Sequence, residues 1–208
     1  MQTITLFYAE MNIKIDKFFY NNRKIFDDVN LEINNKVKYS VSGANGTGKT
    51  TLLRIIMGEI IGNNIQIKDK LKNVLYYSKE LNVLNELSLM ENLQIFRRNY
   101  DFETVEKICK GLNFVEVNKK INQLSEGNKT KVLLISILSI KKYSLLVLDE
   151  PTENLDLDSI SFLQNFLIQI EKPIVLVSHT FAFRDNICST FLEIDNCKIK
   201  IHERSASN

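Results

Sequence analysis

The sequence predicts an α/β fold with a mixed central sheet, an N-terminal antiparallel β subdomain and an inserted helical lobe. Two continuous apolar runs, at 144–150 and 173–179, are typical of buried parallel strands, and a segment with helical spacing separates them. Strand, helix and strand in this order form a βαβ unit, which implies a parallel sheet. We expect a single domain over residues 1–208, with a core of about 11–85 and 141–208 and a helical lobe of about 86–140.

The N-terminal part alternates apolar and polar residues in MNIKIDKFF (11–19) and IFDDVNLEI (25–33), which predicts two antiparallel strands at a sheet edge. The strand VKYSVS (37–42) follows and runs through a glycine-rich turn into the helical segment KTTLLRIIMGEI (49–60). Residues 1–10 are either a further edge strand or an extension upstream of the first strand.

The middle of the chain, from about 86 to 140, lacks a strand pattern. Its segments LMENLQIF, DFETVEKICKGL and KVLLISILSI are expected to be helices of the inserted lobe. The strands SLLVLDE (144–150) and PIVLVSH (173–179) then flank the helical segment DLDSISFLQNFLIQI (156–170).

Composition excludes several classes of protein. The chain has 208 residues, of which 44% are hydrophobic and 25% charged, as in a globular protein that can bury its own core. A net charge of +2 gives no reason to expect a nucleic-acid partner. The three cysteines form no CxxC pair, which is typical of reduced thiols in the cytosol. The longest candidate membrane run, 132–140, is far shorter than the roughly 20 residues that span a bilayer.

The segment GANGTGKT matches the phosphate-loop pattern G-x-x-x-x-G-K-[ST] and lies between an expected strand and an expected helix. Its glycines allow backbone N–H groups to point at phosphate oxygens, and the helix N-terminus adds partial positive charge. The lysine can reach the β- and γ-phosphates, and the threonine after it can ligate Mg²⁺. The alternative is a chance glycine-rich turn. The residues expected to bind nucleotide are Gly43, Ala44, Asn45, Gly46, Thr47, Gly48, Lys49, Thr50 and Thr51.

Two carboxylates end the strand LLVLDE, and a histidine ends the next one. Asp149 is placed to hold Mg²⁺ and Glu150 to polarise an attacking water, although a strand can also simply end in acids. His179 could donate a hydrogen bond to a γ-phosphate, although a lone histidine is more often structural. Ligands of parallel sheets bind at the carboxyl ends of the strands, where all three residues are expected. The expected fold is therefore that of a P-loop NTPase.

From about residue 11 onward, the ordered set of motifs resembles the ATP-binding subunit of an ABC transporter. Tyr20 lies 23 residues before Gly43, where the family stacks adenine on an aromatic ring. LSEGN stands at the place of the family's LSGGQ signature, LLVLDEPTENLD resembles the Walker B strand and D-loop, and ELSLMENLQIF resembles the segment after the Q-loop. The resemblance implies that Ser125, Glu126, Gly127 and Asn128 cap the nucleotide of a second subunit, that Asp156 is the D-loop acid and that His179 is the switch histidine.

The sequence departs from the family pattern at Lys79 and Glu126, and also at Asn154 in the D-loop, where glycine or alanine is common. Lys79 replaces the glutamine of the Q-loop, and an ammonium group cannot ligate a metal. Either Lys79 pairs with a phosphate oxygen, or Mg²⁺ keeps an extra water, or the register shifts locally. The alternative is a solvated lysine in a loop. Glu126 replaces a signature glycine, and its charge would repel a nearby phosphate, so we expect its side chain to point away toward the surface of the helical lobe. SEGNKTKV also resembles the signature of exporter-type subunits for drugs and peptide antibiotics.

The resemblance implies a cytoplasmic subunit, peripheral at the inner face of the cell membrane, that binds and hydrolyses ATP with Mg²⁺. Its expected partners are a transmembrane permease and a second copy of the chain, or another ATPase subunit, that joins it on ATP binding. Two alternatives remain open. One is a soluble ABC ATPase without a membrane partner, acting in assembly or translation. The other is a regulatory ATP-binding module with low turnover, which Lys79 and Glu126 would favour.

Overall fold

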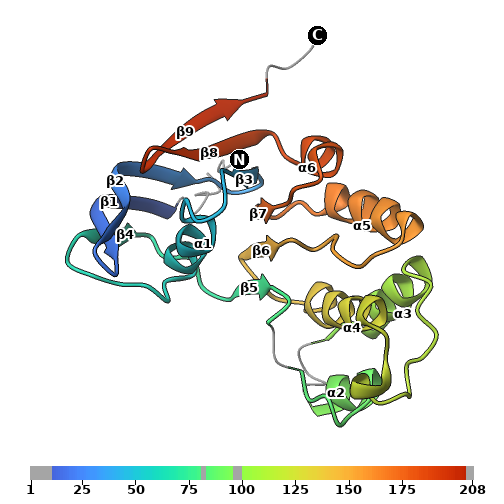
Figure 1. Cartoon of the computed structure of the whole chain (residues 1–208). Helices are drawn as coiled ribbons and strands as arrows, with labels where there is room; N and C mark the ends of the chain where they lie inside the picture. Colours follow the sequence, from blue (N-terminus) through green and yellow to red (C-terminus); the bar gives the residue numbers. More distant parts are fainter. Residues whose placement is uncertain (1–10, 81–82, 96–99, 205–208) are drawn as a thin grey trace, which may run out of the picture.

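A computed structural model describes residues 11–80, 83–95 and 100–204 and contains two sheets (Figure 1). The expectation for residues 1–10 falls outside these ranges. The three-stranded sheet has the order β2-β1-β4, with β1 at Met11–Tyr20, β2 at Arg23–Ile33 and β4 at Ile65–Lys68. The six-stranded sheet has the order β5-β6-β7-β3-β8-β9. Its strands are β3 (Lys38–Ser42), β5 (Val74–Tyr77), β6 (Leu145–Asp149), β7 (Ile174–Val177), β8 (Thr190–Asp195) and β9 (Lys198–Glu203).

The six-stranded sheet is mixed, as the sequence predicts. Strand β3 pairs in parallel with β7 and β8, and β5, β6 and β7 are parallel neighbours, whereas β9 runs antiparallel to β8. Helix α5 (Leu157–Gln169) joins β6 to β7, so the expected βαβ unit is present. Helix α1 (Lys49–Met57) is the next element after β3, from which a six-residue loop separates it.

The N-terminal hairpin is antiparallel, also as predicted. Its turn is formed by Asn21 and Asn22, whose φ values of 45° and 65° suit the tight turn of a two-residue hairpin. The turn sets the register so that Tyr20 lies directly opposite Arg23. Along β1, Met11, Ile13 and Ile15 are buried and the residues between them are exposed, which explains the period-2 pattern of the sequence.

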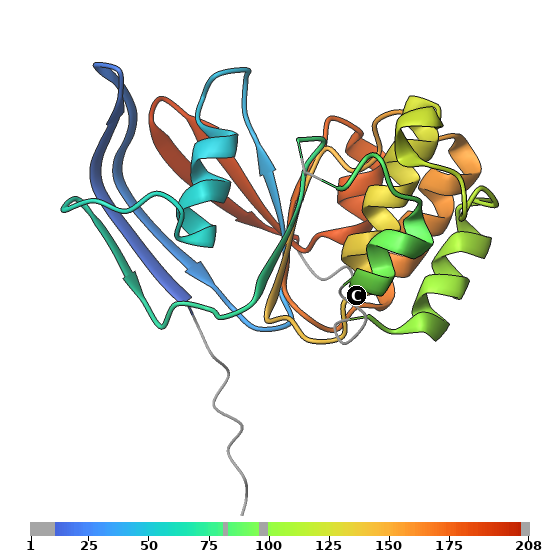
Figure 2. The ribbon, with the colours of Figure 1, turned by 90° about the horizontal axis from the view of Figure 1, so that it is seen from below.

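The central sheet separates two hydrophobic cores. Figure 2 shows α1 and the three-stranded sheet on one side of β5 and β6 and the other helices on the other side. Strand β6 contributes to both cores because alternate side chains point to opposite faces. Leu145 and Val147 pack with α1 and the hairpin, and Leu146 and Leu148 pack with the helices of the lobe.

The helical lobe contains α2 (Leu89–Ile95), α3 (Phe102–Gly111), a 3₁₀ turn at Ile121–Gln123 and α4 (Glu126–Leu138). Helix α4 begins five residues before the apolar segment 131–140 that predicted it, because Ser125 caps it. No helix in the described ranges is long and apolar enough to cross a membrane. Beyond β7, α6 (Phe181–Ile187) and the β8–β9 hairpin extend the predicted set of elements.

Candidate functional site

The phosphate loop joins β3 to α1 and has a backbone that only glycine adopts readily. Gly43, Gly46 and Gly48 have φ values of 148°, 75° and 109°. A Cβ atom at Gly48 would lie 2.5 Å from Cγ2 of Ile25 and 3.1 Å from Cζ of Phe26, so the loop rests closely on β2. The Lys49 ammonium lies within the loop and donates to the carbonyl oxygens of Gly43 at 2.9 Å and Ala44 at 3.2 Å. These carbonyls hold Lys49 where a phosphate oxygen could replace them.

A cleft of about 570 Å³ lies over this loop at the carboxyl ends of the parallel strands. It brings together residues from the hairpin tip, the phosphate loop and the ends of β6 and β7. The sequence-predicted residues that line it are Tyr20, Asn45, Gly46, Gly48, Lys49, Thr50, Thr51, Asp149, Glu150 and His179. Gly43 lines an adjoining cavity of about 520 Å³ together with Lys49, Glu150 and His179. Ala44 and Thr47 line neither cavity and are joined by a 2.9 Å hydrogen bond from Thr47 Oγ1 to the Ala44 carbonyl.

Asp149 ends β6 in a partly buried position beside two other charged residues. Burial and the neighbouring charge of Glu150 raise the pKa of Asp149 above its ordinary value, and the positive charge of Lys49 opposes this rise. The Tyr76 side chain of β5 also opposes the rise in the pKa of Asp149. A cation bound at Asp149 would stabilise the ionised form that burial disfavours.

Glu150 follows Asp149 and has a backbone in the left-handed region, with a φ of 51°. Its backbone N–H donates to the Val177 carbonyl at 2.9 Å. Oε2 accepts a hydrogen bond from the His179 backbone N–H at 3.1 Å, and Oε1 lies 3.4 Å from His179 Nε2. Oε1 is buried and accepts no hydrogen bond from any described residue. A buried carboxylate oxygen of this kind is a suitable acceptor for a water molecule held in the cleft.

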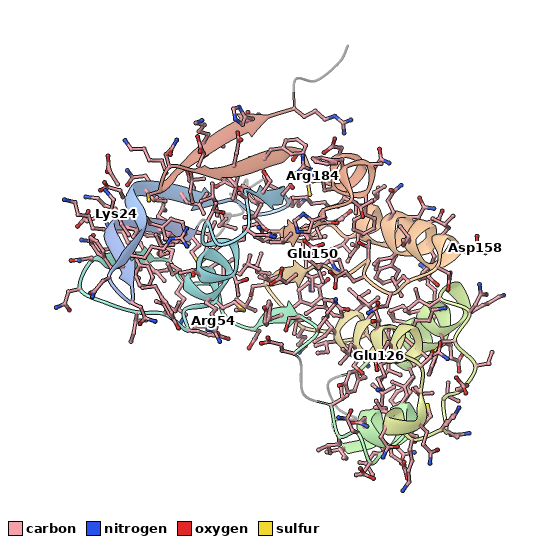
Figure 3. The ribbon with its side chains drawn as sticks, in the orientation of Figure 1. Lys24, Arg54, Glu126, Glu150, Asp158 and Arg184 are labelled. Atoms are coloured by element: carbon pink, nitrogen blue, oxygen red, sulfur yellow. The ribbon has the colours of Figure 1, made fainter. Side chains whose placement is uncertain are left out.

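The segment 125–128 lies outside this cleft. Ser125 caps α4 by accepting a 3.3 Å hydrogen bond from the Asn128 N–H, and Asn128 Nδ2 donates to Glu116 at 2.5 Å. Glu126 is mostly exposed and pairs with Lys129 at 2.7 Å, and Figure 3 shows it on the helical lobe, below Glu150. The chain therefore does not bring these four residues to its own phosphate loop.

Residues 150–156, which follow β6, contact the start of α4. A Cβ atom at Gly127 would lie 2.7 Å from the Asn154 carbonyl oxygen, so Gly127 permits a close approach of two backbone segments. The buried ammonium of Lys131 pairs with Asp156 at 2.8 Å, and Asp156 also caps α5 by accepting from the Ser159 N–H. The hydrogen bond from Lys131 and those from Ser159 hold the pKa of Asp156 well below its usual range. The start of α4 and the segment 150–156 are thus linked within the same chain.

Lys79 forms an ion pair with Glu153, which lies in the segment after β6, and both side chains are about half exposed. It does not line the cleft. Three polar residues in or beside the cleft were not expected from the sequence, namely Arg23, Arg54 and Tyr76. Arg23 and Arg54 line the cleft, and Tyr76 acts on the pKa of Asp149. Tertiary packing brings Arg54 and Tyr76 to the site, and the register of the hairpin brings Arg23, which directly follows the Asn21–Asn22 turn.

A phosphate loop between β3 and α1, with an acidic pair at the end of a parallel strand of the same sheet, defines the class of P-loop nucleoside triphosphatases. Asp149, Thr50 and the unpaired oxygen of Glu150 are oxygen donors of the kind that Mg²⁺ and its waters prefer.

Comparison with known proteins gives the particular family. The family model described as ABC transporter matches residues 26–153, and the chain belongs to this family as an ATP-binding domain. ABC ATP-binding domains bind and hydrolyse ATP. The structure is similar to a solved ATP-binding subunit of an ABC transporter, with a TM-score of 0.79 and 18% identity over 93% of this chain and 89% of that chain.

Two curated relatives differ in what their names say. The chain is 29% identical to the uncharacterized ABC transporter ATP-binding protein YkpA of Bacillus subtilis (strain 168), over 88% of this chain and 41% of that protein. It is also 29% identical to elongation factor 3 of Phytophthora infestans (strain T30-4), over 90% of this chain and 18% of that protein. The chain thus spans less than half the length of either relative.

Proposed function

We propose that the chain is the ATP-binding and hydrolysing subunit that energises transport through a separate transmembrane permease. The proposal rests on the cleft in which Lys49, Thr50, Asp149, Glu150 and His179 meet at the carboxyl ends of the strands. Such a subunit would be cytoplasmic and peripheral at the inner face of the cell membrane. The family to which the chain belongs supports the link to transport.

Each residue of the cleft has a distinct chemical role in this proposal. Lys49 exchanges its carbonyl partners for β- and γ-phosphate oxygens, and Thr50 and Asp149 hold Mg²⁺. Bound Mg²⁺ would neutralise charge that develops on the phosphates. Glu150 Oε1 accepts a hydrogen bond from the attacking water and takes up its proton, and His179 Nε2 donates to the γ-phosphate.

The test is ATP hydrolysis by the purified chain and by Glu150→Gln, which keeps the shape of the side chain but removes the base. General-base catalysis contributes about 10²- to 10⁴-fold, so the variant should lose most of its turnover. ATP affinity should change little, because the phosphates are bound by other residues. Equal turnover of the two proteins would refute the role of Glu150.

We further propose that ATP joins two copies of the chain, or this chain and a paired ATPase subunit. Ser125 and Gly127 lie outside the cleft of their own chain, and α4 presents a capped N-terminus of the kind that binds anions. In a dimer, each signature segment would close the partner's nucleotide, and Asp156 would lie beside it.

Dimer formation can be measured by size-exclusion chromatography of Glu150→Gln with ATP, alone and with Ser125→Arg added. The bulky arginine should abolish the ATP-dependent dimer. Unchanged dimerisation would contradict the proposed position of Ser125. Asn122→Arg, an exposed position in the nearby 3₁₀ turn, is a control for an added charge on this lobe.

A second candidate function is a soluble ABC ATPase that acts in translation or assembly. The likeness to elongation factor 3 favours it, because that name denotes a translation factor. The low-turnover alternative is supported by Lys79, which pairs with Glu153 and does not line the cleft. Fractionation of cells that contain tagged Glu150→Gln distinguishes the transporter subunit from the soluble ABC ATPase. Sedimentation with membranes supports transport, and sedimentation with ribosomal particles supports translation.

A further inference from the structure

The tip of the β1–β2 hairpin carries Arg23 as well as Tyr20 to the mouth of the cleft. The two residues lie directly opposite each other across the Asn21–Asn22 turn. Side chains of directly opposed residues share one face of a hairpin, with Cβ atoms about 5 Å apart. Both residues line the cleft. The register that turns the Tyr20 ring toward the nucleotide therefore turns Arg23 the same way.

The guanidinium of Arg23 lies against the phosphate loop. A Cβ atom at Gly46 would be 3.4 Å from Nη1 and 3.9 Å from Nη2 of Arg23. Gly46 lies in the middle of the loop and has a φ of 75°. Both terminal nitrogens of Arg23 thus face the space that a side chain at Gly46 would occupy, next to the loop that is expected to surround the phosphates.

Arg23 also has its donors free, in contrast to the cations around it. Lys24 pairs with Asp27 at 2.6 Å, Arg54 with Glu59 at 3.5 Å, and Lys49 donates to two loop carbonyls. Within 11–80, 83–95 and 100–204, the guanidinium of Arg23 has neither a carboxylate within 4.0 Å nor a hydrogen-bond partner. A guanidinium that lines an anion site with no internal partner has five N–H donors for phosphate oxygens.

We propose that Arg23 is a further nucleotide-binding residue, whose guanidinium donates hydrogen bonds to oxygens of the phosphate chain. Tyr20 and Arg23 then form a two-residue clamp, in which the ring contacts the base and the guanidinium contacts the phosphates. The planar fork of arginine suits two oxygens at once, which a lysine cannot reproduce. This inference rests on the proposed function, because it takes the cleft to be the ATP site.

The experiment compares the affinity of ATP and of adenosine in the Glu150→Gln background, which prevents turnover. Titration calorimetry gives the Kd for ATP, and an NMR shift titration gives that for adenosine. Arg23→Gln should weaken ATP binding about 10-fold, as expected for the loss of charge-assisted hydrogen bonds at a partly exposed site, and leave adenosine binding unchanged. The ATP affinity of Arg23→Lys should lie between that of the parent and that of Arg23→Gln. Lys24→Gln, which removes the neighbouring charge, should bind ATP like the parent.

Lys49→Ala separates failure of this inference from failure of the proposed function. If Lys49→Ala weakens ATP binding and Arg23→Gln does not, Arg23 is a solvated surface residue and the inference is wrong. If Lys49→Ala also binds ATP normally, the cleft is not the nucleotide site and the proposed function fails. An equal loss of ATP and adenosine affinity in Arg23→Gln would also overturn the phosphate contact, because the hairpin would then act on the base.

Discussion

Gly127→Ala tests whether the signature segment is packed against the D-loop within one chain. The substitution adds one methyl group in the first turn of α4. Helix propensity alone predicts stabilisation, since alanine is favoured over glycine by up to about 1 kcal/mol within a helix. The structure predicts the opposite, because the new Cβ would lie 2.7 Å from the Asn154 carbonyl oxygen.

The size of the effect follows from how far Asn154 must move. Ordinary contacts of a Cβ atom begin at about 3.4 Å, so the Asn154 backbone must move by several tenths of an ångström. Its segment is held by the Lys131–Asp156 pair and by the Asp156 cap on α5, which resist such a movement. Overpacking typically costs about 1–3 kcal/mol, which exceeds the propensity gain. We expect net destabilisation of about 1–2 kcal/mol.

Thermal unfolding of the nucleotide-free protein measures this change without reference to catalysis. At this chain length, 1–2 kcal/mol corresponds to a decrease in Tm of about 2–8 °C. Gly62→Ala is the matched control, because a Cβ at Gly62 meets no atom within 4 Å, and its Tm should be unchanged. A Gly127→Ala protein with an equal or higher Tm would show that helix propensity governs this position and that the close approach is absent.

Three further predictions concern other groups. Asp149→Asn should raise the Tm of the nucleotide-free protein at pH 7. Because the pKa of Asp149 is raised in the folded protein, the wild type loses stability as the pH rises from 3.8, the ordinary pKa, through the folded pKa. A variant whose Tm depends less on pH but is not higher at pH 7 would contradict this prediction. Lys79→Gln should lower the Mg²⁺ concentration for half-maximal ATP hydrolysis about 2- to 10-fold, since an amide oxygen can ligate Mg²⁺. Glu153→Gln breaks the same ion pair without placing an amide oxygen at position 79, so it should leave the required Mg²⁺ concentration unchanged. An equal decrease in both variants would show that loss of the ion pair causes it. A maleimide reagent at pH 8 should label Cys197 before Cys188, whose buried thiol has its pKa raised to about 12, and early labelling of Cys188 would refute its burial.

Most residues that line the cleft were named from the sequence, because they lie in short contiguous segments. The phosphate loop, the acidic pair and His179 each end a recognisable apolar strand, and parallel strands bring such ends to one edge. The fold class follows from the same strands, and the comparisons and the structure confirm it. The β8–β9 hairpin also had a local signal, in the alternation of 190–195 before the Asn196–Cys197 turn.

The rest depends on contacts between distant segments. The approach of Gly127 to Asn154 and the ion pair of Lys79 with Glu153 join parts of the chain that no periodicity relates. The partner of Lys79 explains how this residue can depart from the family pattern, since an ammonium next to a carboxylate is neutralised locally. Arg23 could be placed only once the hairpin register was known.

The parallel pairing of β3 determines when the nucleotide site can form as the chain is synthesised. The elements of the helical lobe are close in sequence, so they can pack as soon as they have been made. Strand β3, which leads into the phosphate loop, is flanked by β7 and β8, and both are made more than a hundred residues later. A nascent chain therefore carries a phosphate loop whose preceding strand lacks both neighbours until β7 and β8 have been made. Its ability to bind ATP should arise late and abruptly, after β8 has left the ribosome.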